Sequence, residues 1–276
     1  MSNTTRTVYG SLLQTYQYAN LPFQMLPNST LNEKFGVQSG VLPTNTPHVG
    51  YYAIGNGGHS FTTGANGVPK PDFYTHQPTD PALYKHLPFV LRATNNDLTA
   101  AQAAKYALRT TLTVGSNTYY AYYLKRLDLS SAVPSVSIQT KNNGTTSTRV
   151  FAPTSANLTP TPVPIGNEAS NSISGTYAVV NATVPIVLTA EECQEIINAA
   201  TILYGDPALA IISEIAICSG EDKSVPISTG SGTLFNEAVG VQVVSFMQTL
   251  HSVYMAQTGI SGTMQIGSYE PMQITA

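Results

Sequence analysis

Glu214 is the ionisable residue with the most chemical promise, because it lies inside the apolar run Ile211-Ile212-Ser213-Glu214-Ile215. An acidic side chain within an apolar strand either loses its charge or has a specific partner. A buried acid of this kind could act as the general acid of a hydrolase. The simpler interpretation, which we adopt, is that Glu214 faces solvent or a neighbouring subunit.

Histidines form a second group with possible chemistry. Four of the five fall in or beside a stretch dense in Gly, Pro and Tyr, residues 49–88, which we interpret as a long ordered loop region; they are His48, His59, His76 and His86. Asp72 and Asp80 lie nearby and are competent metal ligands. The spacings match no ligand pattern on a helix, so we expect hydrogen-bonded loop histidines and no metal.

The string Gly55-Asn56-Gly57-Gly58 could suggest a phosphate cradle, since glycines let backbone amides approach an anion. It lacks the Gly-Lys-Ser/Thr of a Walker loop and the third glycine of a dinucleotide fingerprint. It continues into the β-like run 59–63, so a tight turn with positive φ is the better account. Gly57, Gly58, His59 and His76 are the candidate functional loop residues.

Motifs of known enzymes are missing. The sequence has no Gly-x-Ser-x-Gly elbow, no His-Glu-x-x-His pair and no Cys-x-x-Cys. Enzymes concentrate ionisable residues in a pocket, and this chain has few from which to build one. We therefore expect no catalytic activity, no catalytic residue, no cofactor and no metal.

The shortage of charge is the most informative property of the composition. Charged residues make up 10% of the chain, whereas soluble domains have about 25%. Ser, Thr, Asn, Gln and the 16 tyrosines supply polarity without the cost of burying ions. Such a surface favours contact with partners, although an extracellular or merely unusual monomer is the alternative. A net charge of −3 with no basic cluster argues against nucleic-acid binding.

Segments that would direct the chain to a membrane are also missing. No run approaches the roughly 18 apolar residues of a membrane span, and the first residues have no apolar signal region. We expect a soluble chain without a secretion signal and without membrane contact. Cys193 and Cys218 are too few for a disulfide framework, and free buried thiols are the expectation.

Residues 1–47 show no clean period and predict an extended N-terminal arm that lies on another subunit. Strand and loops on the same domain are the alternative. Phe23 and Leu26 are candidate interface residues on this arm. The following segment, 48–151, is predicted to be β-rich with the long Gly/His/Pro loop.

Several elements of the 48–151 segment have clear signals. Leu87–Arg92 predicts a short strand, and the capping box that opens at Thr99 predicts a short helix. Hairpins are expected around Gly115-Ser116-Asn117 and around Asn142-Asn143-Gly144. The second arm of the first hairpin places Tyr119, Tyr120, Tyr122 and Tyr123 on both strand faces, which makes them candidate interface residues. Cross-strand pairing within one subunit is the alternative.

A Pro/Thr-rich linker, 152–175, precedes an α+β part, 176–276, that is either separate from 48–151 or one domain with it. A strand at 177–188 leads into a capping box at Thr189 and an amphipathic helix that ends at Gly205. A buried strand follows at 210–218, then a long helix at 235–257 and terminal strands. The predicted fold class is α+β, with antiparallel hairpins, two amphipathic helices in the C-terminal third and the extended arm.

Four strings of this sequence resemble segments of virion structural proteins from contractile-tailed bacteriophages. They are Ala53-Ile54-Gly55-Asn56-Gly57-Gly58-His59, Leu87-Pro88-Phe89-Val90-Leu91-Arg92, Tyr122-Tyr123-Leu124-Lys125-Arg126-Leu127-Asp128-Leu129 and Ala210-Ile211-Ile212-Ser213-Glu214-Ile215-Ala216-Ile217-Cys218-Ser219-Gly220. Together they span the body of the chain, and the resemblance assigns no catalytic residue.

The resemblance implies a structural subunit of a phage tail, with a baseplate wedge component as the first expectation. A neck, collar or other head–tail connector component is the second. The implied partners are other virion proteins and copies of the chain in a dimer or ring, within particles assembled in the host bacterial cytoplasm. Two other classes stay open: a tail-tip binding module that recognises a host glycan or fibre through residues 48–86, and the hydrolase with Glu214.

Overall fold

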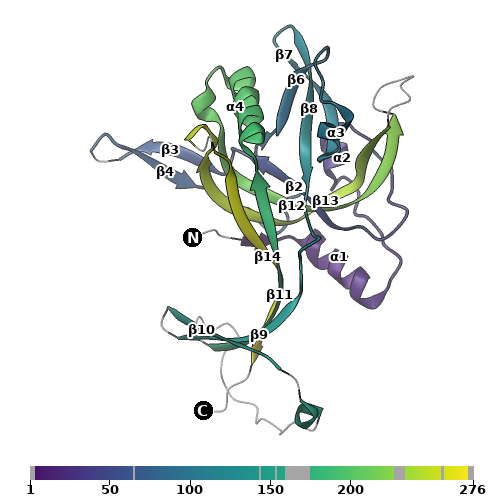
Figure 1. Cartoon of the computed structure of the whole chain (residues 1–276), viewed down its shortest axis with the longest axis vertical. Helices are drawn as coiled ribbons and strands as arrows, with labels where there is room; N and C mark the ends of the chain where they lie inside the picture. Colours follow the sequence, from purple (N-terminus) through teal and green to yellow (C-terminus); the bar gives the residue numbers. More distant parts are fainter. Residues whose placement is uncertain are drawn as a thin grey trace. The chain divides into compact units, whose positions relative to one another are not determined.

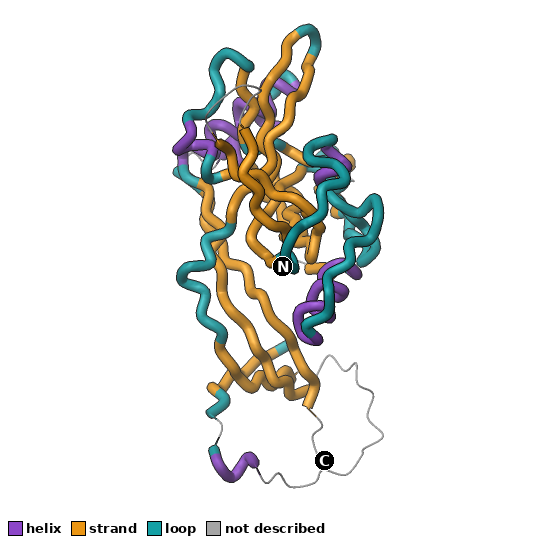
Figure 2. Tube along the Cα trace, turned by 90° about the vertical axis from the view of Figure 1, so that its right-hand side faces the viewer, coloured by secondary structure: helices purple, strands orange, loops and turns teal. Residues whose placement is uncertain are grey.

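The protein is mainly β, with 51% of its residues in strands and 18% in helices. The computed structural model describes residues 4–64, 66–142, 144–152, 154–158, 175–226, 234–255 and 258–272. Antiparallel strands dominate the path of the chain (Figures 1 and 2). The predicted α+β class is therefore confirmed in its coarse form, with mostly β content and one α-helix, not two, in the described C-terminal third.

The chain divides into two compact units. Unit 1 contains residues 1–127 and 187–261, and unit 2 contains residues 128–186 and 262–276. The predicted linker, 152–175, belongs by number to unit 2, and most of it lies outside the described residues.

Unit 1 is built on an eight-stranded antiparallel sheet with the order β1-β13-β12-β2-β8-β6; β5 also pairs with β2, and β7 with β8. Its strands are β1 (Thr4–Arg6), β2 (His48–Gly55), β5 (His86–Leu87), β6 (Val90–Ala93), β7 (Tyr106–Val114), β8 (Asn117–Arg126), β12 (Ile211–Pro226) and β13 (Leu234–Ser252). A separate hairpin pairs β3 (His59–Thr63) with β4 (Pro69–Phe73) and extends away from the other elements of unit 1 (Figure 1).

Helices are short and few. They are α1 (Val8–Ala19), α2 (Leu31–Phe35), α3 (Ala100–Ala103) and α4 (Ala190–Tyr204), with 3-10 turns at Ser155–Leu158, Pro207–Leu209 and Val253–Met255. The predicted capping boxes of α3 and α4 are both present: Thr99 with Gln102, and Thr189 with Glu192. Among the described residues, no helix is long and apolar enough to span a membrane.

The core of unit 1 lies where the central strands meet the small helices. It includes Tyr51, Leu91, Leu124, Val241 and Phe246, each at most 2% exposed. Cys193 and Cys218 are free and buried, as predicted, and burial raises the pKa of both thiols.

The predicted long helix at 235–257 is wrong, because this segment forms the 19-residue strand β13. Its central residues 238–243 are all buried, and a strand buried on both faces shows a continuous apolar run instead of alternation. Register shifts between β12 and β13 interrupt the two-residue period further. Val241 and Val243 were the better indication of a strand in this segment, since β-branched residues favour strands.

The predicted extended arm is also wrong for much of residues 1–47. Thr7 caps α1 by accepting a hydrogen bond from Gly10 N. Gly10 lies so close to Val244 of β13 that a Cβ atom would collide with its backbone, and β1 pairs with β13. The N-terminal segment therefore packs on its own unit, which is the alternative interpretation.

Unit 2 contains one antiparallel sheet with the order β10-β9-β11-β14. Its strands are β9 (Ser135–Asn142), β10 (Thr145–Val150), β11 (Gly175–Leu188) and β14 (Ile260–Met272), and the ends of β11 and β14 extend into residues of unit 1. The hairpin predicted near Gly144 is confirmed as β9–β10, with positive φ at Gly144.

Candidate functional site

Glu214 lies at the centre of unit 1 and not at its surface. It occupies the buried part of β12, where Ser213 is 0% and Glu214 1% exposed. The expectation that Glu214 faces solvent or a subunit is wrong. The specific partner that its apolar surroundings require is present in the same chain.

The Glu214 carboxylate accepts four hydrogen bonds. Oε1 accepts from the backbone N–H groups of Gly57, at 2.9 Å, and Lys85, at 3.0 Å. Oε2 accepts from the N–H of Tyr84, at 3.1 Å, and lies 2.8 Å from Nε2 of His76. Hydrogen bonds to a charged acceptor are among the stronger ones in proteins, and these four occupy the lone pairs of both oxygens.

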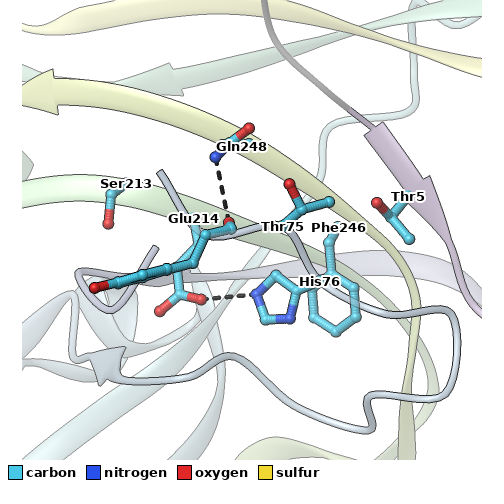
Figure 3. A pocket seen from close by; sticks show the side chains of 8 residues that line it. Thr5, Thr75, His76, Ser213, Glu214, Phe246 and Gln248 are labelled. Atoms are coloured by element: carbon cyan, nitrogen blue, oxygen red, sulfur yellow. Dashed lines mark hydrogen bonds and ion pairs between the residues drawn. The ribbon is translucent and has the colours of Figure 1, made fainter. Parts of the chain in front are cut away.

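His76 connects this carboxylate to a second one. Its Nδ1 lies 3.0 Å from Oδ2 of Asp80, so each ring nitrogen faces a carboxylate oxygen. Both contacts are hydrogen bonds when each nitrogen carries a hydrogen, which is the imidazolium form. The ring is also stacked between Tyr84 and Phe246, with centroids 4.1 Å and 3.8 Å away and interplanar angles of 10°. Figure 3 shows Phe246 beside His76. We call Glu214, His76 and Asp80 the buried charge cluster.

Gly55, Gly57 and Gly58 allow the backbone to lie very close to Glu214, Lys85 and Ser213. None of the three has a positive φ, so the predicted turn with positive φ is wrong. A Cβ atom on Gly55 would lie 2.5 Å from Oε1 of Glu214, and one on Gly57 would lie 2.7 Å from Lys85 N. One on Gly58 would lie 2.8 Å from Ser213 O. Only glycine lets this backbone reach the carboxylate.

The same contacts hold the base of the β3–β4 hairpin. Gly58 N donates to Ser213 Oγ at 3.0 Å, and Tyr74 N donates to Gly58 O at 3.0 Å. Gln248 of β13 donates through Nε2 to Tyr74 O at 3.2 Å (Figure 3). Gly58 precedes β3 and Tyr74 follows β4, so both ends of the hairpin are fixed to the central strands of unit 1.

The free space beside the buried charge cluster is small. A pocket lined by His76, Ser213, Glu214 and Phe246 has a volume of about 10 Å³, room for about one water molecule. A substrate does not fit there, and the Glu214 oxygens are already occupied. The buried charge cluster can anchor the backbone of Gly57, Tyr84 and Lys85 and can hold a buried charge. In this form it presents no free side-chain group to a reactant.

The structure brings together three of the four loop candidates. Gly57, Gly58 and His76 meet at Glu214 and Ser213. His59 begins the hairpin, where its ring packs edge-on against Phe61. Burial lowers the pKa of His59, and the charge of Glu214 acts in the opposite direction.

The tyrosine candidates separate into two pairs. Tyr122 is 0% and Tyr123 7% exposed, so both belong to the core of unit 1 and cannot form a surface. Tyr119 packs against that core, and Tyr120 lies under the Arg109 guanidinium at 3.6 Å. Packing within one subunit therefore accounts for Tyr122 and Tyr123, the latter stacked on Phe35, while Tyr119 and Tyr120 are half-buried.

The candidates of the N-terminal segment are more accessible. Leu26 is 45% exposed, while Phe23 is half-buried and packs edge-on against Tyr16. Leu26 lines a groove together with Met25 and Leu42.

In the part of the chain that the structure describes, no three His, Cys, Asp or Glu side chains are arranged so that they could hold one metal ion. His76 is hydrogen-bonded, as predicted for the loop histidines. His86 is not, because both ring nitrogens are buried without a partner, and this burial lowers its pKa to about 3.

Sequence reasoning missed most partners of Glu214. Asp80 was considered only as a metal ligand and Phe246 only as part of the predicted helix at 235–257, and Tyr84 and Lys85 were not considered. The backbone donors of Tyr84 and Lys85 leave no side-chain signal. The apolar setting of Glu214 was a valid signal that a partner exists.

The chain belongs to the family of unknown function DUF7208, which matches residues 1–276. No curated protein and no solved structure matches it significantly.

Proposed function

We propose that this protein is a non-catalytic structural subunit of a large assembly, the virion of a tailed bacteriophage, with the tail baseplate as its place. The assembly is chosen on the sequence resemblance. Two of the resembling strings, 53–59 and 210–220, are neighbours in the fold, because β2 pairs with β12. These strings contain Glu214 and the glycines at its carboxylate, so the resemblance falls on residues that anchor the fold.

The observation that carries the subunit proposal is the exposure of unit 2. Among its described residues, the buried apolar side chains are Ile138, Val179, Val184 and Met264. A sheet with so few buried side chains gains little from its own core, because stability follows the apolar area removed from water.

Apolar side chains of the same unit are left in water. Val133 is 75% exposed, Val150 81% and Leu158 85%. Exposed apolar area of this kind is typical of surfaces that a partner covers. With 10% charged residues, the chain also has few ions to desolvate when it is covered.

Purified particles test this proposal directly. We expect mass spectrometry of density-banded particles from a culture that produces the protein to find it in amounts comparable to tail proteins. It should remain with tails after tails and heads are separated, and a map of the intact particle should place it at the baseplate.

Three results would argue otherwise. Retention with heads would favour a neck or collar component, and location at the tail tip with glycan binding would favour a host-recognition module. A chain missing from particles would overturn the proposal.

A further inference from the structure

Strand β10 is an outer strand of the unit 2 sheet, and one of its edges is open. The order β10-β9-β11-β14 gives β10 a single neighbour, and among the described strands no other pairs with it. All six residues of β10 are exposed, and its register with β9 runs from Thr145 to Val150 without a shift. A regular edge strand presents unpaired N–H and C=O groups along its outer side.

The hydrogen bonds to β9 identify the residues whose main-chain groups point outward. Phe151 N donates to Val136 O at 3.1 Å, so the residues of β10 with odd numbers bond to β9. In an antiparallel pair these residues alternate with residues whose N–H and C=O groups point to the opposite side. Thr146, Thr148 and Val150 therefore direct their main-chain groups away from β9.

The two edges of this sheet are protected unequally. The far edge, β14, contains Glu270 and Pro271, and both residue types hinder pairing with a further strand. β10 has the sequence Thr-Thr-Ser-Thr-Arg-Val, without proline, glycine or lysine. Most of its residues are β-branched, which favours strand pairing. An unprotected and regular edge is a template for one more strand.

The open edge of β10 fits the same edge of a second copy in one antiparallel register. With Thr148 opposite Thr148, Thr146 lies opposite Val150, and all three outward-facing residues find a partner. Arg149, the only charged residue of the strand, then lies opposite the neutral Ser147. Moving the centre of pairing one residue forward would place Arg149 opposite Arg149, which is unfavourable. Moving it one residue back would leave Val150 without a strand partner.

The same register covers apolar side chains that a single chain leaves in water. Val150 is 81% exposed and would pack against Thr146 of the second copy. Phe151, 38% exposed, would lie opposite Thr145. A hollow of about 370 Å³ lies beside that position and is lined by Thr140, Asn142, Thr145 and Ser147. It has room for an aromatic ring, since a cavity of about 150 Å³ accommodates benzene. Each copy therefore carries both the ring and the hollow that would receive it.

We propose that two copies of this chain pair through β10, antiparallel and with Thr148 at the twofold axis, so that their unit 2 sheets become one continuous sheet. Such a contact uses the same surface of both copies and closes as a dimer. The inference deepens the proposed function by naming a partner of the subunit, and it rests on that function for the assembly that the dimer enters. Unit 2, which buries few of its own apolar side chains, gains cover from the second copy.

Thr148→Pro tests the main-chain contact. The N–H of Thr148 faces away from β9, so proline removes no hydrogen bond within the chain but removes both central bonds of the dimer. Thr148→Ala shortens the same side chain, keeps the N–H group and serves as the matched control. Light scattering coupled to size exclusion, over a range of concentrations, should show dimers of the wild type and of Thr148→Ala. The dimer affinity of Thr148→Pro should be lower by about 30-fold or more.

Like charges at the axis test the symmetry and the register. Thr148→Lys alone and Thr148→Asp alone would each place two like charges opposite each other, whereas a mixture of the two variants can place opposite charges there. Heterodimers in the mixture should form about tenfold more tightly than the homodimers of either variant. Added salt should reduce this difference. Circular dichroism of each variant checks that it is folded.

Several outcomes would overturn the inference. A wild-type chain that stays monomeric would do so, as would a Thr148→Pro chain that dimerises like Thr148→Ala, or a mixture without preferred heterodimers. A foreign strand along β10 in a particle map would identify another virion protein as the occupant and would equally overturn it.

The two proposals can fail separately. A purified chain that stays monomeric but is found in particles would leave the proposed function intact. A chain that dimerises through β10 but is missing from particles would remove that function and not the contact.

Discussion

The base of the β3–β4 hairpin and the hairpin itself differ in almost every property, although they are adjacent in sequence. The base is buried, charged and held by backbone and side-chain hydrogen bonds to β12 and β13. The hairpin is exposed and is paired only with itself among the described strands. The difference indicates that the base fixes the position of the hairpin, while Phe61 and Phe73 on the hairpin are left in water.

Glu214→Gln should have the largest effect on the base. The new amide NH₂ would face backbone N–H donors, and His76 would lose its buried carboxylate partner. Breaking a buried charge pair costs about 3–5 kcal/mol, so we expect a loss of that size in urea unfolding. The surface variant Glu270→Gln serves as the control, and equal stability of the two variants would contradict the role of the buried charge cluster.

His76→Phe should cost about 2–4 kcal/mol, because it keeps the stacking with Tyr84 and Phe246 but removes two hydrogen bonds to charged groups. Asp80→Asn should cost less, since the Asp80 side chain is 26% exposed and that of Glu214 1%. Equilibrium unfolding of both variants gives the order. The reverse order would show that Asp80 stabilises the base mainly through contacts other than His76, such as its hydrogen bond from Gln77 N.

Gly58→Ala should cost about 1–3 kcal/mol, the usual range for an added methyl group in a tightly packed place. The cause is the 2.8 Å approach of the new Cβ to Ser213 O. Gly262→Ala is the control, since nothing lies within 4 Å of a Cβ there. Thermal unfolding of the two variants should differ clearly, and identical midpoints would refute close packing at the base.

Phe61→Ser, on the hairpin, should change the stability of the monomer by no more than about 0.5 kcal/mol. The side chain is half exposed and supports no core residue. Urea unfolding at low protein concentration measures this. A loss as large as that of Gly58→Ala would mean that the hairpin is part of the core.

His59 should contribute the smallest effect, visible as a dependence on pH. Its pKa lies below the ordinary value of 6.5, so its stabilising contribution is present above about pH 6.5 and is lost as pH falls through the lowered pKa. We expect part of the acid-induced loss in unfolding free energy to disappear in His59→Gln. Identical pH profiles of wild type and variant would contradict this.

Local signals predicted local structure well. The capping boxes at Thr99 and Thr189 and the hairpins at Gly115 and Gly144 are present, because each depends on residues close in sequence. β13 was mistaken for a helix, since burial on both faces and its irregular pairing with β12 removed the alternation that identifies a strand.

The candidate site was predictable only in part. Glu214 could be recognised as unusual from its apolar neighbours, but three of its four partners are backbone N–H groups, which no residue type marks. The glycines at 55–58 were noticed for the wrong reason. Glycine is required at these positions because Ser213 and the Glu214 carboxylate approach from β12, more than 150 residues later in the sequence.

The pairing of β1 with β13 has a consequence for biosynthesis. Thr4 lies opposite Met247, and the central strands β12 and β13 come from the last quarter of the chain. The strands of residues 4–126 therefore emerge from the ribosome before the strands on which they pack, and unit 1 can complete its fold only after β13 has been synthesised. Pairing over such sequence distances is slow, so chaperones that shield nascent chains should raise the yield of soluble protein.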